Sequence, residues 1–109
     1  MKTETVQGYT CVVGTDKEEN WRLLDESESL YWFFHLSDFP SCYVILQTEE
    51  KVEKSIITAC AKLCLENTKF RNMRSIYVDY TTIDNVKKGD MVGEVYYKSY
   101  KKVKKIKLN

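Results

Sequence analysis

The sequence has little of what marks linkers and repeats. Its 109 residues include one proline and four glycines, and no segment is repeated or of low complexity. A chain of this length is close to the most common domain size, and it can bury roughly two-thirds of its unfolded surface. We therefore expect a single domain over residues 1–109 that folds without disulfides.

Long apolar runs are missing too. No stretch approaches the roughly 20 apolar residues of a membrane-spanning helix, and the first segment, MKTETVQGYT, lacks the apolar stretch of a signal peptide. We therefore expect a cytoplasmic protein with no membrane association. In that compartment Cys11, Cys42, Cys60 and Cys64 are expected to be free thiols that pack as small apolar residues.

The motifs of enzymes and cofactor sites are also missing. The glycines are isolated, so neither a Walker A loop nor a dinucleotide-binding fingerprint is present. Cys60 and Cys64 have a spacing that suits zinc on a helix, but strong zinc signatures pair two such clusters. Cys42 and His35 would need a third, orienting residue to act as a Cys–His hydrolase, and none has motif spacing. The sequence therefore predicts no enzyme, no metal and no cofactor.

The hydrophobic pattern that is present predicts an α+β fold. Residues 49–67 repeat apolar side chains at helical spacing and predict one long amphipathic helix, and residues 15–27 predict a short helix with acidic residues in its first turn. Strands are predicted over residues 8–14, 30–36, 42–48, 75–82, 93–100 and 101–108. We expect one twisted sheet, mixed or antiparallel, with the long helix on one face and the last strand at an edge.

The only histidine, His35, lies in the aromatic run LYWFFHL. Strand alternation places His35 on the same face as Tyr31 and Phe33, whereas Trp32 and Phe34 point to the other face. Both faces are rich in aromatic rings, so this strand is predicted to be central and covered on both sides. Two interpretations of His35 stay open: a buried residue that holds a loop by a hydrogen bond, or a residue that contacts a ligand.

The net charge is only +1, but the charges are unevenly distributed. Residues 96–109 contain six lysines and no acid, whereas residues 16–28 contain six acidic and two basic residues, so one end of the molecule should favour anions. On the predicted strand of residues 93–100, Tyr96 and Lys98 share a solvent face with Glu94 and Tyr100. Alternating rings and ammonium groups of this kind suit the stacking of bases and the binding of phosphates.

Further cations surround the predicted turns. They follow the long helix or precede the turn near residue 89, and they are Lys69, Arg71, Arg74, Lys87 and Lys88. We predict that these residues contact phosphates. The lysines between residues 104 and 107 have a second explanation of equal weight, because lysines on an edge strand prevent aggregation.

Four segments occur in a characteristic order: VVGTDKEENWRLL, WFFHLSDFPSCYVIL, ACAKLCLENTKFR and IYVDYTTIDNVKKGDMVGEV. Together they resemble the NFACT-R domain, the RNA-binding module of the NFACT ribosome-quality-control proteins, over about residues 8–108. The positions that match its motifs are Gly14, Asn20, His35, Pro40, Ala59, Ala61, Tyr80, Thr81, Val86, Lys87, Lys88 and Gly93. The sequence departs from the family at Tyr31, where an aspartate is usual, at Phe33, where a tryptophan is usual, and at Tyr43, where a second histidine is usual.

The resemblance implies a non-catalytic module that binds RNA, such as tRNA or ribosomal RNA, in translation or ribosome quality control. His35 and Tyr43 would line the binding site beside the predicted phosphate contacts. DNA, the ribosome and a larger protein are further candidate partners. The alternative is a protein–protein adapter that binds no nucleic acid and docks by a sheet edge or by the face of residues 96–100.

Overall fold

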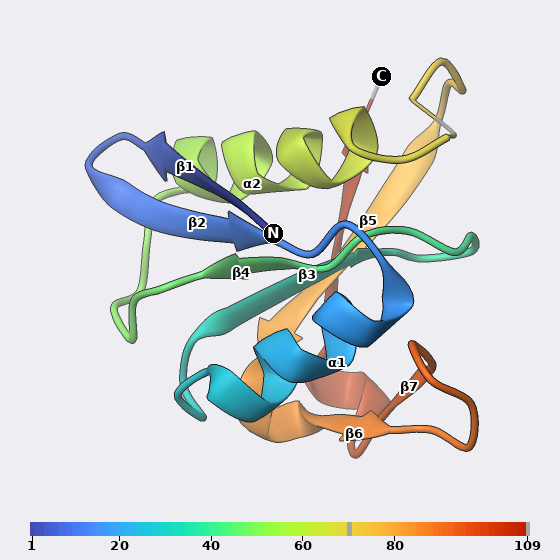
Figure 1. Cartoon of the computed structure of the whole chain (residues 1–109). Helices are drawn as coiled ribbons and strands as arrows, with labels where there is room; N and C mark the ends of the chain where they lie inside the picture. The colour runs from blue at the N-terminus through green and yellow to red at the C-terminus, as the bar shows by residue number, and fades with distance from the viewer. Residues whose placement is uncertain (70, 109) are drawn as a thin grey trace.

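The computed structural model describes residues 1–69 and 71–108, so Phe70 and Asn109 lie outside the described residues. Its main sheet consists of β1 (Lys2–Val6), β2 (Tyr9–Val13), β3 (Trp32–Leu36), β4 (Val44–Leu46), β5 (Ile76–Thr82) and β8 (Lys104–Leu108). The order across the sheet is β1-β2-β4-β3-β5-β8, and every neighbouring pair is antiparallel. The predicted α+β fold is confirmed, and β8 lies at an edge as predicted (Figure 1).

Each face of the sheet is covered by a helix (Figure 1). The long helix α2 (Lys54–Glu66) packs on one face, where its apolar side chains form the larger core cluster with the strands. The short helix α1 (Lys17–Glu26) lies on the other face, next to a separate hairpin of β6 (Val86–Lys88) and β7 (Val95–Tyr97). Among the described residues, neither helix is long and apolar enough to cross a membrane.

The aromatic strand β3 joins the two layers. Phe34 is fully buried and faces α2, in one cluster with Val44 and Cys60. Phe33 is also fully buried but faces α1, in the other cluster with Ile45. Burial of apolar surface contributes roughly 25 cal/mol per Å², so alternate residues of β3 stabilise both layers at once. The predicted alternation of β3 is therefore confirmed.

The strand β1 was not predicted from the sequence. It pairs with β2 across a two-residue turn at Gln7 and Gly8, whose φ angles of +48° and +88° are those of a tight hairpin turn. Residues 2–5 are all exposed, so β1 carries no alternation of apolar and polar residues. Periodicity could not detect it for that reason.

The predicted strand over residues 93–100 is wrong in length and in pairing. Only β7 is a strand, and it pairs with β6 instead of joining the main sheet. The cause is Asn85, whose side-chain amide donates to the Ser99 carbonyl at 2.9 Å and whose side-chain oxygen accepts from the Ser99 N–H at 2.9 Å. The chain turns there, and Tyr100 leaves the predicted face and packs its ring against Tyr97, with 5.5 Å between centroids.

The long helix begins later than predicted, at Lys54 rather than Glu49. The preceding residues form a loop, because the Glu50 carbonyl accepts a hydrogen bond of 2.9 Å from the indole N–H of Trp32. Glu53 has extended backbone angles and is the N-cap residue. A tertiary contact has therefore shortened the helix at its start.

All four cysteines are free and buried, as the sequence predicts. Cys11 on β2 and Cys60 on α2 face each other with 3.5 Å between their sulfur atoms. The Cys42 thiol lies 3.4 Å from the carbonyl oxygen of Cys64. The cysteines thus fill the space between the sheet and α2 as small apolar residues do.

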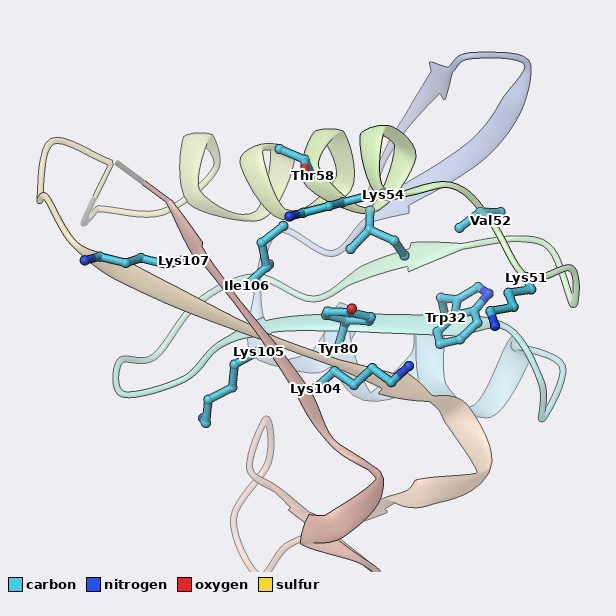
Figure 2. A pocket seen from close by; sticks show the side chains of 11 residues that line it. Trp32, Lys51, Val52, Lys54, Thr58, Tyr80, Lys104, Lys105, Ile106 and Lys107 are labelled. Atoms are coloured by element: carbon cyan, nitrogen blue, oxygen red, sulfur yellow. The ribbon is translucent and has the colours of Figure 1, made fainter.

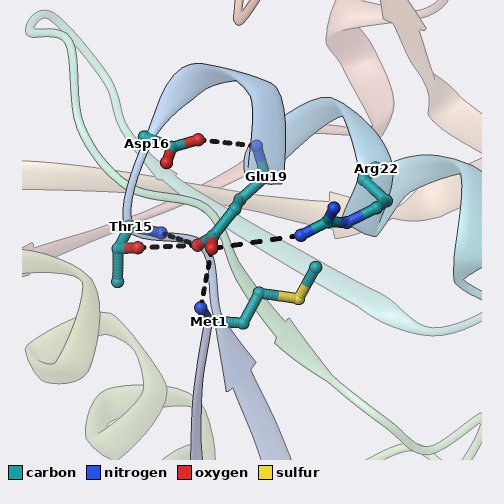
Figure 3. A network of polar contacts seen from close by, with 5 residues as sticks. All are labelled: Met1, Thr15, Asp16, Glu19 and Arg22. Atoms are coloured by element: carbon teal, nitrogen blue, oxygen red, sulfur yellow. Dashed lines mark hydrogen bonds and ion pairs between the residues drawn. The ribbon is translucent and has the colours of Figure 1, made fainter.

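The start of α1 is held by a set of hydrogen bonds around Asp16 and Glu19 (Figure 3). The Asp16 carboxylate, at the N-cap, accepts from the Glu19 N–H at 2.8 Å. The Glu19 carboxylate accepts from the N–H and hydroxyl of Thr15 at 2.9 and 2.6 Å, and from the Met1 amino group at 2.8 Å. These donors, the Met1 amino group above all, lower the pKa of Glu19 to about 2. The bond from the Glu19 N–H to Asp16 is one half of a capping box, whereas the Glu19 carboxylate binds Thr15, one residue before the N-cap, and adds an ion pair with Met1.

The lowered pKa of Glu19 makes stability depend on pH. Because the folded-state pKa is about 2 and the ordinary value is 4.5, the stabilisation is present above pH 4.5 and is lost as the pH falls towards 2. In urea titrations across this range, Glu19→Gln should lose less stability than the native chain. The exposed neighbour Glu18 gives the matched control Glu18→Gln, which should keep the native pH dependence.

Candidate nucleic-acid interface

Tyr43, predicted to line a binding site, is fully buried just before β4. Its hydroxyl donates to the Gly93 carbonyl at 2.6 Å, its N–H donates to the Asn20 side-chain oxygen at 3.2 Å, and its carbonyl accepts from the Gly14 N–H at 3.0 Å. Burial raises the pKa of the Tyr43 hydroxyl, so it remains a protonated donor. Tyr43 therefore does not line the surface but lies beneath it, where its hydrogen bonds hold three separate segments together.

This arrangement explains why two of the motif positions are glycines. A Cβ atom at Gly14 would lie 2.2 Å from the side-chain oxygen of Asn20. A Cβ atom at Gly93 would lie 2.7 Å from the Cβ of Lys17, and Gly93 has a φ of +89° that other residues rarely adopt. Both positions bring backbone close to α1, which lets Tyr43 reach its partners.

His35 is half-buried beside Tyr43. Its ring stacks on Phe33, with 6.2 Å between centroids and 9° between planes, and meets the edge of Tyr43 at 5.5 Å. Burial lowers the pKa of His35 below its ordinary 6.5, against the opposing effects of the Leu36 backbone and the Asp79 carboxylate. The imidazole is therefore neutral at neutral pH, so it presents a hydrogen-bonding group and not a charge to a ligand.

Two cavities meet at His35. One, of about 440 Å³, is also lined by Lys69, and the other, of about 660 Å³, by Asp79; Pro40 borders both. Cys42 lines the first cavity but packs in the core on the α2 side, whereas the His35 ring contacts the aromatic cluster on the α1 side. The arrangement gives no support to a Cys–His catalytic pair.

The second cavity has a buried carboxylate at its base. Asp79 is 5% exposed and accepts hydrogen bonds from the hydroxyls of Ser37 and Tyr97, at 2.6 and 3.0 Å. It also accepts from the ammonium group of Lys105, at 2.7 Å. The charge of Lys105 is therefore compensated within the protein. Asp79 links the end of β3 to β7 and β8.

The neighbouring lysines of β6 point to opposite faces of the hairpin. Lys87 lies opposite Tyr96 in the register, and both are exposed on the outer face. Lys88 points inward, with its ammonium group 2.7 Å from the Asp25 carboxylate and 5.1 Å from the centre of the Trp21 ring. Lys87 and Tyr96 are thus available to a ligand, whereas Lys88 fastens the hairpin to α1.

The other predicted cations lie elsewhere on the surface. Lys98 is exposed just after β7, and Arg74 is exposed in the loop before β5. Arg71, in the same loop, lines a hollow together with Lys62 and Lys107. The structure therefore places the predicted site residues in three regions: the His35 cavities, the hairpin, and the loop that follows α2.

The surface between α2 and β8 holds a feature that the sequence-based prediction missed (Figure 2). A cavity of about 640 Å³ lies there, and its lining residues are Trp32, Lys51, Val52, Lys54, Ile57, Thr58, Tyr80 and residues 104–107. Among the described residues, no acidic side chain lines it. Figure 2 shows Lys51 and Lys104 reaching towards Trp32, while Lys54 extends from α2 above Ile106.

This cavity continues into the hollow at Arg71, since Thr58 and Lys107 line both. We call the two together the α2–β8 seam. Lys54, Thr58 and Lys62 are spaced four residues apart and so follow one edge of α2. Five cations of the seam have no acidic partner within 4.0 Å among the described residues: Lys51, Lys54, Lys62, Arg71 and Lys104. Lys107 lies opposite Tyr77 in the register, so its side chain points to the other face of the sheet. Glu66 also lines the hollow at Arg71.

The sequence contains a partial signal of this seam. The spacing of Lys54, Thr58 and Lys62 marks a polar helix edge, and Lys104 is one of the lysines that the edge-strand explanation also accounts for. Only the packing of β8 beside α2 brings these residues to one groove with Trp32. No cluster of three potential metal-ligating side chains occurs within residues 1–69 and 71–108.

The opposite orientations of Lys87 and Lys88 lead to a prediction. Lys88→Ala should lower the free energy of unfolding by about 1 kcal/mol, because an exposed ion pair and a cation–π contact each contribute about 0.5 kcal/mol. Lys87→Ala removes the same charge from the outer face and should change it by less than about 0.5 kcal/mol. Urea denaturation of the two variants measures both values, and equal losses would contradict these orientations.

Relatives of the chain are known. It is 32% identical over 100 residues to the Rqc2 homolog RqcH of Bacillus subtilis (strain 168), which covers 88% of this chain and 17% of that protein. It is 30% identical over 108 residues to the coiled-coil domain-containing protein 25 homolog of Dictyostelium discoideum, which covers 91% of this chain and 52% of that protein. The chain thus spans about half of one relative and a smaller part of the other.

A solved structure shares the fold. The C-terminal part of the fibronectin/fibrinogen-binding protein from Streptococcus suis superposes with a TM-score of 0.86, over 97% of this chain and 43% of that chain, at 21% sequence identity. The family described as the NFACT protein RNA binding domain matches residues 1–99. The resemblance predicted from the sequence is confirmed: the chain belongs to the NFACT RNA-binding domain family.

Proposed function

We propose that this chain is a non-catalytic RNA-binding module that holds RNA along the α2–β8 seam. The observation that carries the proposal is the row of cations without an ion-pair partner that begins at two half-buried aromatic rings, Trp32 and Tyr80, and continues along α2 to Arg71. Ammonium and guanidinium groups bind phosphates by charge and release counterions from the RNA. The family to which the chain belongs is described by RNA binding, which supports the same assignment.

The residues predicted from the sequence take different parts in this proposal. Arg71 and Arg74 would contact phosphates at the end of the seam, and Lys69 would contact them beside the His35 cavity. Lys87, Lys98 and Tyr96 would add contacts from the hairpin. His35, Tyr43 and Lys88 would shape the surface without binding phosphates. His35 is neutral at neutral pH, and Tyr43 and Lys88 have partners within the protein.

The biological setting is part of the proposal. The relative named Rqc2 homolog RqcH supports a role in ribosome quality control, with tRNA or ribosomal RNA as the ligand and the cytoplasm as the place of action. The ribosome or a larger protein would present that RNA. Since the chain spans only part of its relatives, this setting rests on the shared domain alone.

One observation favours an adapter as a second candidate. The hairpin and the turn after it expose large apolar side chains, with Met91 72% exposed and Tyr100 69% exposed. Exposed apolar groups of this size often mark protein interfaces. An adapter would dock through this surface and would bind its partner with little dependence on salt.

Salt titration tests the seam. Fluorescence anisotropy should show labelled tRNA and ribosomal RNA fragments binding with an affinity that falls steeply with salt, and more tightly than duplex DNA. Lys54→Ala/Lys62→Ala should reduce the slope of log K against log salt by about 1.4 to 1.8, which is about 0.7 to 0.9 for each lost phosphate contact.

The control variant removes a cation from the other helix. Arg22→Ala removes an exposed charge from α1, on the opposite face of the sheet, and should keep the native slope. If the control lowers the slope and the seam variant does not, RNA binds on the α1 face and the seam is wrong. If the native chain binds no RNA at any salt concentration, the RNA-binding function is wrong and the adapter is favoured.

A further inference from the structure

We infer that the Trp32 end of the seam is a stacking site for an unpaired base, so that the RNA held there is single-stranded. This inference rests on the proposed function and specifies the class of its ligand. It comes from the two aromatic rings in the cavity and not from the cations, which would bind duplex and single strands alike.

Both rings are held in place before any ligand binds. The indole of Trp32 is fixed by its hydrogen bond of 2.9 Å to the Glu50 carbonyl. Tyr80 stacks on the fully buried Phe34, with 5.7 Å between centroids and 18° between planes. Since the orientations of both rings are already fixed, a base that stacks on either ring binds with little loss of side-chain conformational entropy.

The two rings leave room for a third. Their centroids are 6.3 Å apart and their planes are tilted by 55°, so Trp32 and Tyr80 do not stack face to face on each other. The cavity that they line has a volume of about 640 Å³, which is within the range of small-molecule sites. A planar base can therefore lie against one of these rings.

The charges around the rings suit the rest of a nucleotide. Lys51 and Lys104 approach Trp32 from the two sides of the cavity (Figure 2), where their ammonium groups can bind the phosphates on either side of a stacked base. The Tyr80 hydroxyl has no hydrogen-bond partner among the described residues and lies at the cavity. Aromatic rings flanked by cations are the usual means of holding single strands, because every base has a face that can stack.

A duplex cannot use these rings in the same way. Its bases are already stacked on each other and paired, so it would contact the seam through phosphates alone. Substitutions of Trp32 and Tyr80 should therefore change the affinity for single strands. The affinity for duplexes should change only when the lysines are substituted.

The test uses two tyrosines of the same strand. Tyr80→Leu keeps an apolar side chain in the cavity but removes the ring, and should weaken binding of a short single-stranded oligoadenylate by about tenfold or more. Tyr80→Phe should keep the native affinity within about twofold, since it retains the ring. Tyr77→Leu is the matched control, because Tyr77 is 42% exposed on the opposite face of β5, and it should bind like the native chain.

Fluorescence gives a second readout. Oligoadenylate should quench the tryptophan emission of the native chain, and Trp32→Phe should abolish the quenching although Trp21 remains. Circular dichroism spectra that match the native chain would verify the fold of each variant. Affinity of an RNA duplex of the same length should be unchanged by Tyr80→Leu.

The outcomes separate this inference from the proposed function. If Tyr80→Leu and Tyr77→Leu bind oligoadenylate equally well, or if quenching persists in Trp32→Phe, the stacking site is wrong although RNA binding stands. If the native chain binds neither single-stranded nor duplex RNA, the proposed function fails and the stacking site fails with it. Binding of an acidic peptide at the same lysines, without any response to the rings, would also overturn the inference.

Discussion

The fold on the α1 side depends on the buried hydrogen bonds of Tyr43. This one residue joins β4 to the turn after β2, to α1 and to the loop of the hairpin. A buried donor or acceptor without a partner costs about 1 to 3 kcal/mol, so the three segments are held in place by groups that have no other means of being satisfied. The glycines at positions 14 and 93 follow from the same constraint, since any side chain there would displace Asn20 or Lys17.

A second buried group completes this layer. Asp79 accepts hydrogen bonds from Ser37, Tyr97 and Lys105, and thereby connects the centre of the sheet with the hairpin and the last strand. Because Tyr43 and Asp79 both have hydrogen-bond partners within the protein, these polar groups near His35 stabilise the fold. The two faces of the sheet therefore differ. On the α1 face the buried polar residues hydrogen-bond to one another and stabilise the fold. On the α2 face the core is apolar, and the cations at its edge remain available to a ligand.

That difference explains which predictions from the sequence were successful. The helices and the central strand were predicted because their apolar residues recur at periods that the core imposes, as in β3, where Phe33 and Phe34 face different layers. The strand β1 and the turn at Ser99 were missed because neither depends on periodicity. One depends on a tight turn at Gln7 and Gly8, and the other on the side chain of Asn85.

The candidate site was harder to predict than the fold. Arg71 could be named as a phosphate contact because it is charged and follows a helix, but Lys88, equally charged, proved to bind Asp25. Charge in a sequence does not distinguish the two cases, since the compensating carboxylate lies 63 residues away. Trp32 was predicted to be covered, and Tyr80 was noted only as a motif position, for a related reason: their exposure depends on how closely β8 approaches α2.

By itself, the sequence determined the fold class, the family, the free state of the cysteines and the absence of recognisable catalytic motifs. These follow from patterns that are local in the chain: apolar periodicity, glycine placement and the order of short motifs. Only the tertiary structure decided which cations remain available and which aromatic rings border a cavity. Both properties depend on contacts between distant segments, because a charge is compensated and a ring is covered by whatever the fold brings beside it.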